Sequence, residues 1–446
     1  MTRDIDLALL YKYDQPASDY GTFPAVVRFS KTLGADSYRL AALSSNEDPI
    51  PKPLTAYVHM PSWPCRDSGE TARYLDCLKR EIALQGALFD ADRRIGRLVL
   101  VGNRASHLGD DQLADVLDEL HHYFGLEPRR DASLCFEPSR LSTQRLAALG
   151  FNRLTVGAAD LGVASGLTHR PQPSTNQDWL NEWTAARRAC LRPFAIDLTL
   201  ELAGATESGF SALLESLVHL RPERLTLRRD GEHGGLGLSY ASTTGQEVSA
   251  PERRVTLTRL VQGLERLVPA GYVHLGMGHF ALSSDTLAAA QRHGWLRRCL
   301  QGYDARGDSD CIGLGAGAIS LVADGYYQNA RQSRDYCARL ESGKLAIRRG
   351  YELSADDRLR RDVIRHLMGS GGVIYEAIEK RHRIVFGNYF APEMLALQAM
   401  ANDGLVNVRR DSIGLTQVGR LLMNRIAMIF DGAFNQLQPR RLQMIR

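Results

Sequence analysis

The sequence predicts an α/β protein: an open, partial (β/α)6-type parallel barrel with an N-terminal arm and a mostly helical, winged-helix-like C-terminal domain. Two observations lead to this fold. Between residues 54 and 268, short apolar runs alternate with longer segments that carry apolar residues at helical spacing. Repeated strand–helix units form parallel sheets with right-handed crossovers. Beyond residue 358 the alternation stops and helical patterns follow one another.

The barrel elements follow in order along the chain. Near-continuous apolar runs, such as RLVLVG, are typical of strands that are buried on both faces of a parallel sheet. We expect strands at 54–60, 97–102, 133–138, 153–157, 194–202 and 224–229, and helices at 70–89, 110–124, 142–150, 176–190, 207–220 and 251–268. Ligand sites in such folds lie at the carboxyl ends of the strands.

The remaining segments define the other parts of the molecule. The glycine-rich stretches 276–281 (GMGHFA) and 313–320 (GLGAGAIS) are expected to be irregular. Helices are expected at 359–368, 375–382, 392–403 and 417–430, with two short strands at 404–408 and 412–416. We therefore divide the chain into an arm at 1–50 with a turn at 20–24, a barrel with a glycine-rich extension at 51–330, and a helical domain at 331–446 that covers the barrel.

Composition restricts the function classes. With 44% hydrophobic and 24% charged residues, the 446-residue chain has the composition of a soluble globular protein. Its net charge of +4 is far from the clustered basic footprint of a nucleic-acid-binding protein. No signal sequence or membrane span is visible, and the seven cysteines show no metal-ligand spacing such as CxxC. A cytoplasmic protein with reduced thiols is expected.

A series of motifs resembles one known family. These are DLALLYKY at 6–13, YVHMP at 57–61, GFNRLTVG at 150–157, GMGHFA at 276–281, QGY at 301–303 and GLGAGAIS at 313–320. Their order and sequence resemble those of the oxygen-independent coproporphyrinogen III oxidases, which are radical S-adenosylmethionine (SAM) enzymes, over nearly the whole chain. The resemblance implies the fold described above and an oxidative decarboxylation of two propionates that uses SAM and a 4Fe–4S cluster.

The cluster motif of that family is absent. In the family, the strand that ends in Tyr-Val-His-Ile-Pro runs into a CxxxCxxC loop whose thiolates hold the cluster. The corresponding positions here are Trp63, Asp67 and Glu70, and the loop contains one cysteine, Cys65. Oxygen and indole side chains do not replace soft thiolate ligands. We therefore expect no metal site, no cluster and no SAM as cofactor.

Further departures affect the surfaces that contact SAM in the family. The Gly-Gly-Gly-Thr-Pro segment is replaced by Gly102-Asn103-Arg104-Ala105 after Val101, and a carboxylate by Cys135. Ala159 replaces a glutamine and Gly278 an aspartate. The surrounding strands and helices remain well patterned, which favours a selective loss of the cofactor surfaces.

Seven positions still match the family's site, and the resemblance implies that they bind a ligand: Tyr57, His59, Arg170, Asp197, His279, Gln301 and Tyr303. The alternative for each is a structural role, since polar side chains at sheet ends are commonly satisfied by neighbouring groups. No catalytic residue is assigned.

The leading hypothesis is a cluster-less relative of the oxidase that binds a tetrapyrrole, such as haem or a porphyrin, or that pairs with an active oxidase in haem biosynthesis. Arg104 and Arg170 would attract the propionates. The alternatives are an active coproporphyrinogen dehydrogenase, haem ligation by His59, His169 or His279, and DNA binding through Arg409 and Arg410 in the C-terminal domain. Packing against the barrel is the expected role of that domain, so nucleic acid and membrane are not expected partners.

Overall fold

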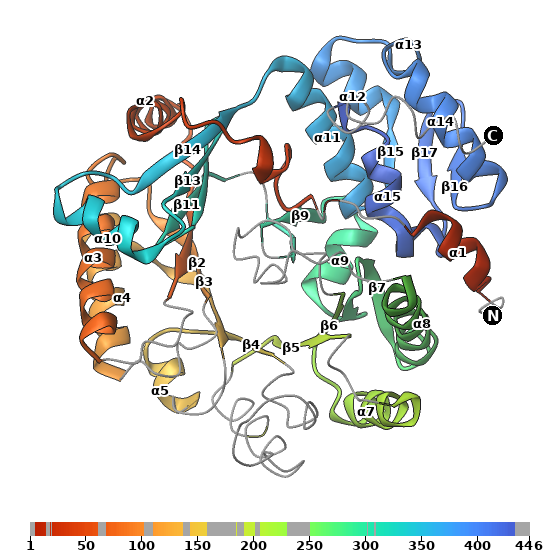
Figure 1. Cartoon of the computed structure of the whole chain (residues 1–446), viewed down its shortest axis with the longest axis horizontal. Helices are drawn as coiled ribbons and strands as arrows, with labels where there is room; N and C mark the ends of the chain where they lie inside the picture. Colours follow the sequence, from red (N-terminus) through yellow and green to blue (C-terminus); the bar gives the residue numbers. More distant parts are fainter. Residues whose placement is uncertain are drawn as a thin grey trace.

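A mixed sheet of twelve strands organises the described part of the molecule, in the order β14-β13-β12-β11-β1-β2-β3-β4-β5-β6-β8-β7. The computed structural model describes residues 5–14, 18, 20–60, 68–101, 110–136, 143–157, 184, 191–200, 206–229, 250–300, 302–306 and 309–432. The sheet curves into an open ring, and the helices that connect its strands lie outside it (Figure 1). Its two edges, β14 and β7, do not pair with each other, so the barrel is partial.

The parallel half of the sheet confirms the predicted strand–helix alternation. Its strands are β1 (Leu54–His59), β2 (Ile95–Val101), β3 (Leu126–Phe136), β4 (Arg153–Gly157), β5 (Phe194–Thr199) and β6 (Arg224–Arg228). The helices are α3 (Ser68–Gly86), α4 (Asp110–Phe124), α5 (Thr143–Ala148), α7 (Glu207–Leu220) and α8 (Ala250–Leu267). Apart from Thr184, the predicted helix at 176–190 lies outside the described residues.

Successive side chains of each strand point alternately to the helices outside the sheet and to the interior of the barrel. On β1, Leu54, Ala56 and Val58 pack into the main hydrophobic core with the apolar face of α3. Tyr57, on the opposite face, belongs to a second cluster with Val99 of β2. Because neighbouring strands are in register, the interior-facing residues of the whole sheet converge on one space.

The prediction that the glycine-rich stretches are irregular was wrong. They contribute to β7 (Tyr272–Gly276), β8 (His279–Leu282), β11 (Cys311–Leu314) and β12 (Ile319–Val322), which the chain continues into β13 (Gly325–Asn329) and β14 (Ile347–Glu352). Gly278 and Gly315 occupy the tight connections between these short strands, where a side chain would collide with neighbouring backbone. β11 pairs parallel with β1, whereas β12–β14 continue the sheet in antiparallel fashion, through residue 352.

A short hairpin lies inside the ring. It consists of β9 (Arg297–Cys299) and β10 (Gly302–Asp304) and follows α9 (Thr286–Arg292). Figure 1 shows β9 near the centre of the ring. Leu300 packs with Tyr57 of β1, so the hairpin fills interior space next to the first strand. The sequence analysis did not predict these two strands.

The C-terminal region confirms a helical domain with a small sheet. Its helices are α11 (Ala355–Gly369), α12 (Tyr375–His382), α13 (Phe386–Tyr389), α14 (Ala391–Asn402) and α15 (Met423–Met428). The preceding helix α10 (Ser333–Glu341) connects β13 to β14 and packs against α3 of the barrel. β15 (Gly372–Ile374), β17 (Ser412–Leu415) and β16 (Val406–Val408) form the sheet. The predicted last helix is divided into the 3-10 helix η4 (Gly419–Leu422) and α15.

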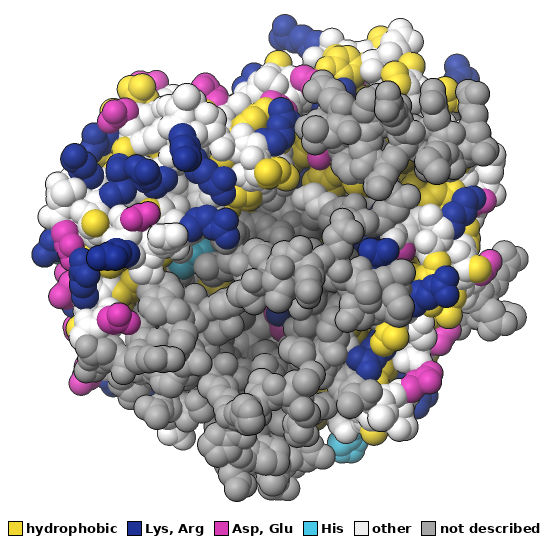
Figure 2. Space-filling model, in the orientation of Figure 1, with side chains coloured by type: hydrophobic (Ala, Val, Ile, Leu, Met, Phe, Trp, Pro, Cys, Tyr) yellow, Lys and Arg dark blue, Asp and Glu magenta, His cyan; other side chains and the backbone are white. Residues whose placement is uncertain are grey.

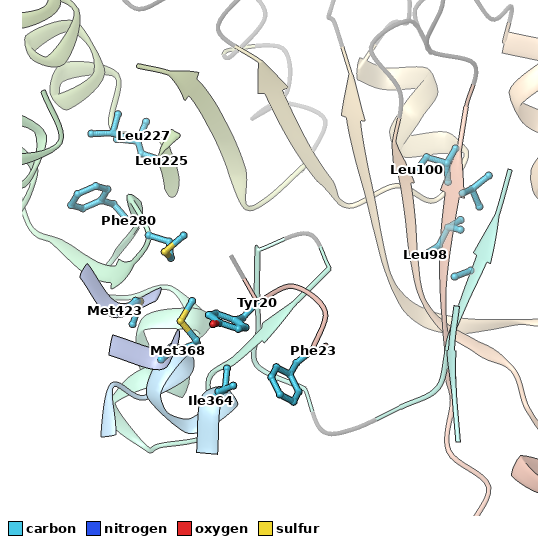
Figure 3. Close-up of a cluster of buried hydrophobic side chains, with 14 of the residues drawn as sticks. Tyr20, Phe23, Leu98, Leu100, Leu225, Leu227, Phe280, Ile364, Met368 and Met423 are labelled. Atoms are coloured by element: carbon cyan, nitrogen blue, oxygen red, sulfur yellow. The ribbon is translucent and has the colours of Figure 1, made fainter. Parts of the chain in front are cut away.

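The N-terminal segment ties the barrel to this domain. It forms α1 (Leu7–Tyr13), η1 (Val26–Arg28) and α2 (Ala35–Asn46). Figure 3 shows Tyr20 and Phe23 of this segment near Ile364 and Met368 of α11, within the main core. None of the described helices has the length and hydrophobicity that a membrane span requires.

Candidate functional site

His59 is the last residue of β1 and is a buried polar side chain. Its side chain lies on the interior face, and the residue is 1% exposed. Neither ring nitrogen has a hydrogen-bond partner of normal geometry among the described residues. Burial lowers the pKa of His59 to about 4, with a partial offset from the backbone of Ala316, so the imidazole is neutral at physiological pH. Two unpaired buried nitrogens are an exception that calls for a ligand or a bound water.

The backbone of His59 is fixed by a turn from β11 to β12. The Tyr74 hydroxyl donates to the His59 carbonyl at 2.7 Å, and the Ala316 N–H donates to the Tyr74 oxygen at 2.9 Å. Gly315 has a φ of +98°, and a Cβ there would lie 2.4 Å from the His59 carbonyl oxygen. This close approach requires glycine. The turn therefore holds the end of β1 in one position.

Glu81 of α3 anchors this turn from the outer side of the sheet. Its carboxylate accepts hydrogen bonds from the Gly315 N–H at 2.7 Å, the Tyr336 hydroxyl at 2.6 Å, and the side-chain amides of Asn329 at 2.6 Å and Gln85 at 3.0 Å. Burial raises the pKa of Glu81 to about 7, although the four donors oppose this shift. Glu81 is not predicted from the sequence, because an isolated glutamate in an amphipathic helix resembles a surface residue.

Tyr57 lies two residues before His59 on β1, so both side chains are on the same face of the sheet. It is 1% exposed and packs with Leu300 of the hairpin and Tyr326 of β13. Burial raises the pKa of Tyr57 well above its usual value, and the nearby thiols of Cys299 and Cys311 reinforce that shift. The phenol is therefore a neutral group of the barrel interior.

A second cluster joins three of the predicted residues on the other side of the ring. His279 of β8 lies with its Nδ1 3.3 Å from the Thr226 hydroxyl and its Nε2 3.4 Å from Nη1 of Arg298. The ring of Tyr303 stands edge-on to His279, with 5.1 Å between centroids, and Arg298 lies over the Tyr303 ring. Burial, followed by the positive charge of Arg298, lowers the pKa of His279 well below its usual value.

Asp197 extends this cluster across the sheet. It is in register with Thr226 of β6, which is in turn opposite His279. Arg228 Nη2 lies 4.0 Å from the Asp197 carboxylate. The structure thus brings Asp197, His279 and Tyr303 together, and it adds Thr226, Arg228 and Arg298. Because residues two apart on a strand share a face, the alternation along β6 could have predicted that Thr226 and Arg228 face the same side.

The structure describes only some of the remaining predicted positions. Arg170 and Gln301, and the cluster positions Trp63 and Asp67, lie outside the described residues. Glu70 lies in the exposed first turn of α3. Gly278 has a φ of +68°, and a Cβ there would lie 2.0 Å from the Leu227 carbonyl oxygen, so this backbone does not accept the aspartate of the resembled family.

Four cysteines, Cys77, Cys299, Cys311 and Cys337, lie away from the end of β1, whereas the backbone of Cys135 on β3 is in register with Val101, the partner of His59. Cys77 and Cys337 are buried together between α3 and α10, with the Cys77 sulfur 4.0 Å from the Cys337 carbonyl oxygen. Cys311 begins β11 and is in register with Thr55 at the start of β1, and Cys299 lies beside it. Within the described ranges, no group of three or more His, Cys, Asp or Glu side chains is placed to hold a metal ion.

Basic side chains border the hollow at the centre of one face. Figure 2 shows lysine and arginine side chains along the margin of this hollow, over the part of the molecule that contains β13, β14 and α10 in Figure 1. These side chains give this margin of the face a positive charge.

An open ring of parallel strands with polar residues at their carboxyl ends is the architecture of a radical SAM protein. The solved structure of coproporphyrinogen III oxidase from Escherichia coli, described as a radical SAM enzyme, superimposes with a TM-score of 0.82 at 29% identity and covers 97% of this chain and 100% of its own. No protein-family model matches the chain.

Sequence relatives agree with the structural match. The oxygen-independent coproporphyrinogen III oxidase of Pseudomonas aeruginosa is 30% identical over 99% of this chain and 98% of its own length. The corresponding protein of Escherichia coli is 31% identical over 97% of this chain and 96% of its own length. The chain therefore belongs to the oxygen-independent coproporphyrinogen III oxidase family.

Proposed function

We propose that this chain is a cluster-less member of its family, which binds a tetrapyrrole without carrying out SAM-dependent oxidation. One observation carries the first half of the proposal. The segment at 61–70 offers a single cysteine, Cys65, where the family's motif supplies three thiolates. Of the other cysteines, Cys77, Cys299, Cys311 and Cys337 are placed elsewhere by the described structure.

The chemistry of the donors explains why the cluster does not fit. Iron–sulfur clusters are held by Cys thiolates, and the substituting side chains at the motif positions are an indole and two carboxylates. The two described thiols closest to β1, Cys299 and Cys311, lie towards the start of the strand, and burial raises the pKa of Cys311 to about 12. A thiol with this pKa is not a thiolate at neutral pH.

The second half of the proposal rests on the polar and basic groups that the fold places around the barrel interior. On the interior face, His59 carries a neutral imidazole whose ring nitrogens have no hydrogen-bond partner of normal geometry in the described ranges of the chain. Arg228 and Arg298 lie on the opposite side of the ring, near His279. A tetrapyrrole with carboxylate side chains matches both features, since guanidinium groups pair with carboxylates and a neutral imidazole donates a hydrogen bond or ligates iron. The relatives are named as oxidases of such a molecule.

Titration with haemin and with coproporphyrin III tests the ligand. We expect saturable spectral changes in the wild-type protein. His59→Ala should bind at least tenfold more weakly, because a tenfold loss of affinity is about the effect of losing one hydrogen bond to a buried group. His293→Ala removes an exposed histidine and serves as the matched control. Equal affinities in the two variants, or no binding by the wild-type protein, would remove His59 from the proposal.

An active coproporphyrinogen dehydrogenase is the second candidate, and full-length family membership favours it. Reconstitution with iron and sulfide under anaerobic conditions separates the two candidates. A third role, association with an active oxidase in haem biosynthesis, follows from the shared fold. Co-purification of the chain with such an oxidase from the same cell would test that role directly.

A further inference from the structure

A cavity lies towards the start of β1, away from His59, and Tyr57 of the candidate site is among its lining residues. Its volume is about 580 Å³, and it is bounded by the starts of β1 and β11, by the β9–β10 hairpin and by helices α11 and α12. Thr55 and Cys311, which are in register at the start of their strands, mark its floor. The cavity therefore lies on the amino-terminal side of the barrel, whereas the candidate site above lies at the carboxyl ends of the strands.

The walls of this cavity carry an excess of positive charge. Among the described residues, eight basic and five acidic side chains line it. Four of the five acidic groups form ion pairs: Asp310 with Arg93 at 2.7 Å, Asp304 with Arg97, Asp48 with Lys52 at 3.4 Å, and Asp324 with both Arg358 and Arg361 at 3.3 Å. The excess charge therefore belongs to the arginines of the hairpin and the two helices.

These arginines converge from three separate elements. Arg297 and Arg298 come from β9, Arg361 and Arg365 lie one turn apart on α11, and Arg381 comes from α12. Side chains at i and i+4 share one helix face, so like charges at these positions repel each other. Several of these arginines also make contacts within the protein. Their gathering around one cavity nevertheless raises the local positive potential.

Two of the arginines that line the cavity are buried side chains and do not lie on the outer surface. Arg298 is 8% exposed and Arg361 is 7% exposed. The Nε of Arg361 is buried and has no hydrogen-bond partner in the described part of the chain. Because Arg361 lines the cavity, its guanidinium is suited to bind a planar oxyanion there, since its N–H groups match carboxylate and phosphate geometry.

We propose that this cavity binds a small polyanion that carries carboxylate or phosphate groups. The cavity is within the size range of small-molecule sites. The β9–β10 hairpin joins the two ends of the barrel, because Arg298 lines the cavity and also contacts His279 of the candidate site. The proposal does not depend on tetrapyrrole binding or on the absence of a cluster.

Isothermal titration with pyrophosphate and with citrate tests the site and distinguishes phosphate from carboxylate ligands. We expect saturable binding of at least one of the two to the full-length protein, which weakens as salt is raised. Arg297→Gln and Arg365→Gln should each reduce the affinity about tenfold. Neither residue belongs to the proposed tetrapyrrole site, and thermal unfolding verifies that each variant is folded.

Arg334→Gln is the matched control, since it removes the same charge from the exposed face of α10. It should bind both anions as the wild-type protein does. Absence of saturable binding to the wild-type protein would overturn the proposal. An equal loss of affinity in Arg334→Gln would also overturn it, because binding would then reflect the net charge of the protein and not the cavity.

Discussion

The buried imidazole of His59 is destabilising for the fold in the absence of a ligand. Both ring nitrogens lack partners among the described residues, and the pKa of the side chain is lowered to about 4. Groups of this kind are retained at functional sites, where binding satisfies them. The sequence located His59 through its motif. It did not show that the nitrogens are unpaired, because that depends on the turn of β11–β12, more than 250 residues away.

His59→Leu is therefore expected to stabilise the protein. Removing two unsatisfied buried nitrogens should raise the free energy of unfolding by about 1 kcal/mol at pH 7.5. The folded-state pKa lies below the unfolded value of 6.5, so the wild-type protein loses stability as pH falls from 6.5 towards 4. The advantage of the variant should thus grow by about 1.4 kcal/mol per pH unit in this window.

Urea denaturation at pH 7.5 and pH 5.5 measures this difference. His293→Leu, at an exposed position, should change the stability by less than about 0.5 kcal/mol at either pH. If His59→Leu shows the same increment at both pH values, His59 is solvated or paired in the folded protein, and its role as a free ligand group is contradicted.

Glu81 is the residue that the sequence concealed most completely. Its carboxylate receives four hydrogen bonds at the back of the glycine turn. Glu81→Ala leaves these donors without an acceptor and should lower the free energy of unfolding by about 3 kcal/mol or more. Asp76→Ala, on an exposed position of the same helix, should be nearly neutral. Urea denaturation of both variants tests the contrast, and similar values for the two would show that the Glu81 network does not support the turn.

At the scale of elements, the sequence predicted long periodic segments and missed short ones. The six predicted strands and the five predicted helices of this region that the structure describes appear near the positions that the apolar pattern indicates, although β3 begins seven residues earlier than predicted. The short strands of the glycine-rich stretches gave no periodic signal, since β11 and β12 are each four residues long. Their structure is imposed by pairing with β1, which is a tertiary effect.

The glycine turn offers a test at this scale. Gly315→Ala places a Cβ 2.4 Å from the His59 carbonyl oxygen at a φ of +98°, and should lower the free energy of unfolding by about 3 kcal/mol. Gly343→Ala meets no atom within 4 Å at a φ of +72°, so it should lose only about 1 kcal/mol. Thermal or urea unfolding compares them. Equal losses would mean that the turn does not press against β1.

At the scale of the whole molecule, long-range ion pairs join regions that the sequence analysis treated separately. Asp14, at the end of α1, accepts two hydrogen bonds of 2.8 Å from Arg229 and one of 3.2 Å from Arg425 of α15. The arm thus links the barrel to the C-terminal domain through a buried triad. Such contacts depend on the complete fold, and no local sequence pattern predicts them.

The same scale explains what is retained in this chain and what is changed. The fold matches that of a radical SAM enzyme over nearly its full length. The changed positions are concentrated at 63–70, 102–105, 135, 159 and 278, and most of the first two groups lie outside the described residues. The interior cluster of Asp197, His279 and Tyr303 remains assembled. This contrast supports the proposal that the chain keeps the fold of its family but does not bind the cluster or SAM.

Iron content after anaerobic reconstitution tests the central proposal most directly. The protein is incubated with iron, sulfide and a reductant, desalted, and analysed for iron together with its visible spectrum, with the Pseudomonas aeruginosa relative treated in parallel. We predict substoichiometric iron and no cluster absorption in this chain, whereas the relative should become brown. A brown protein with a stoichiometric cluster that cleaves added SAM would contradict the account.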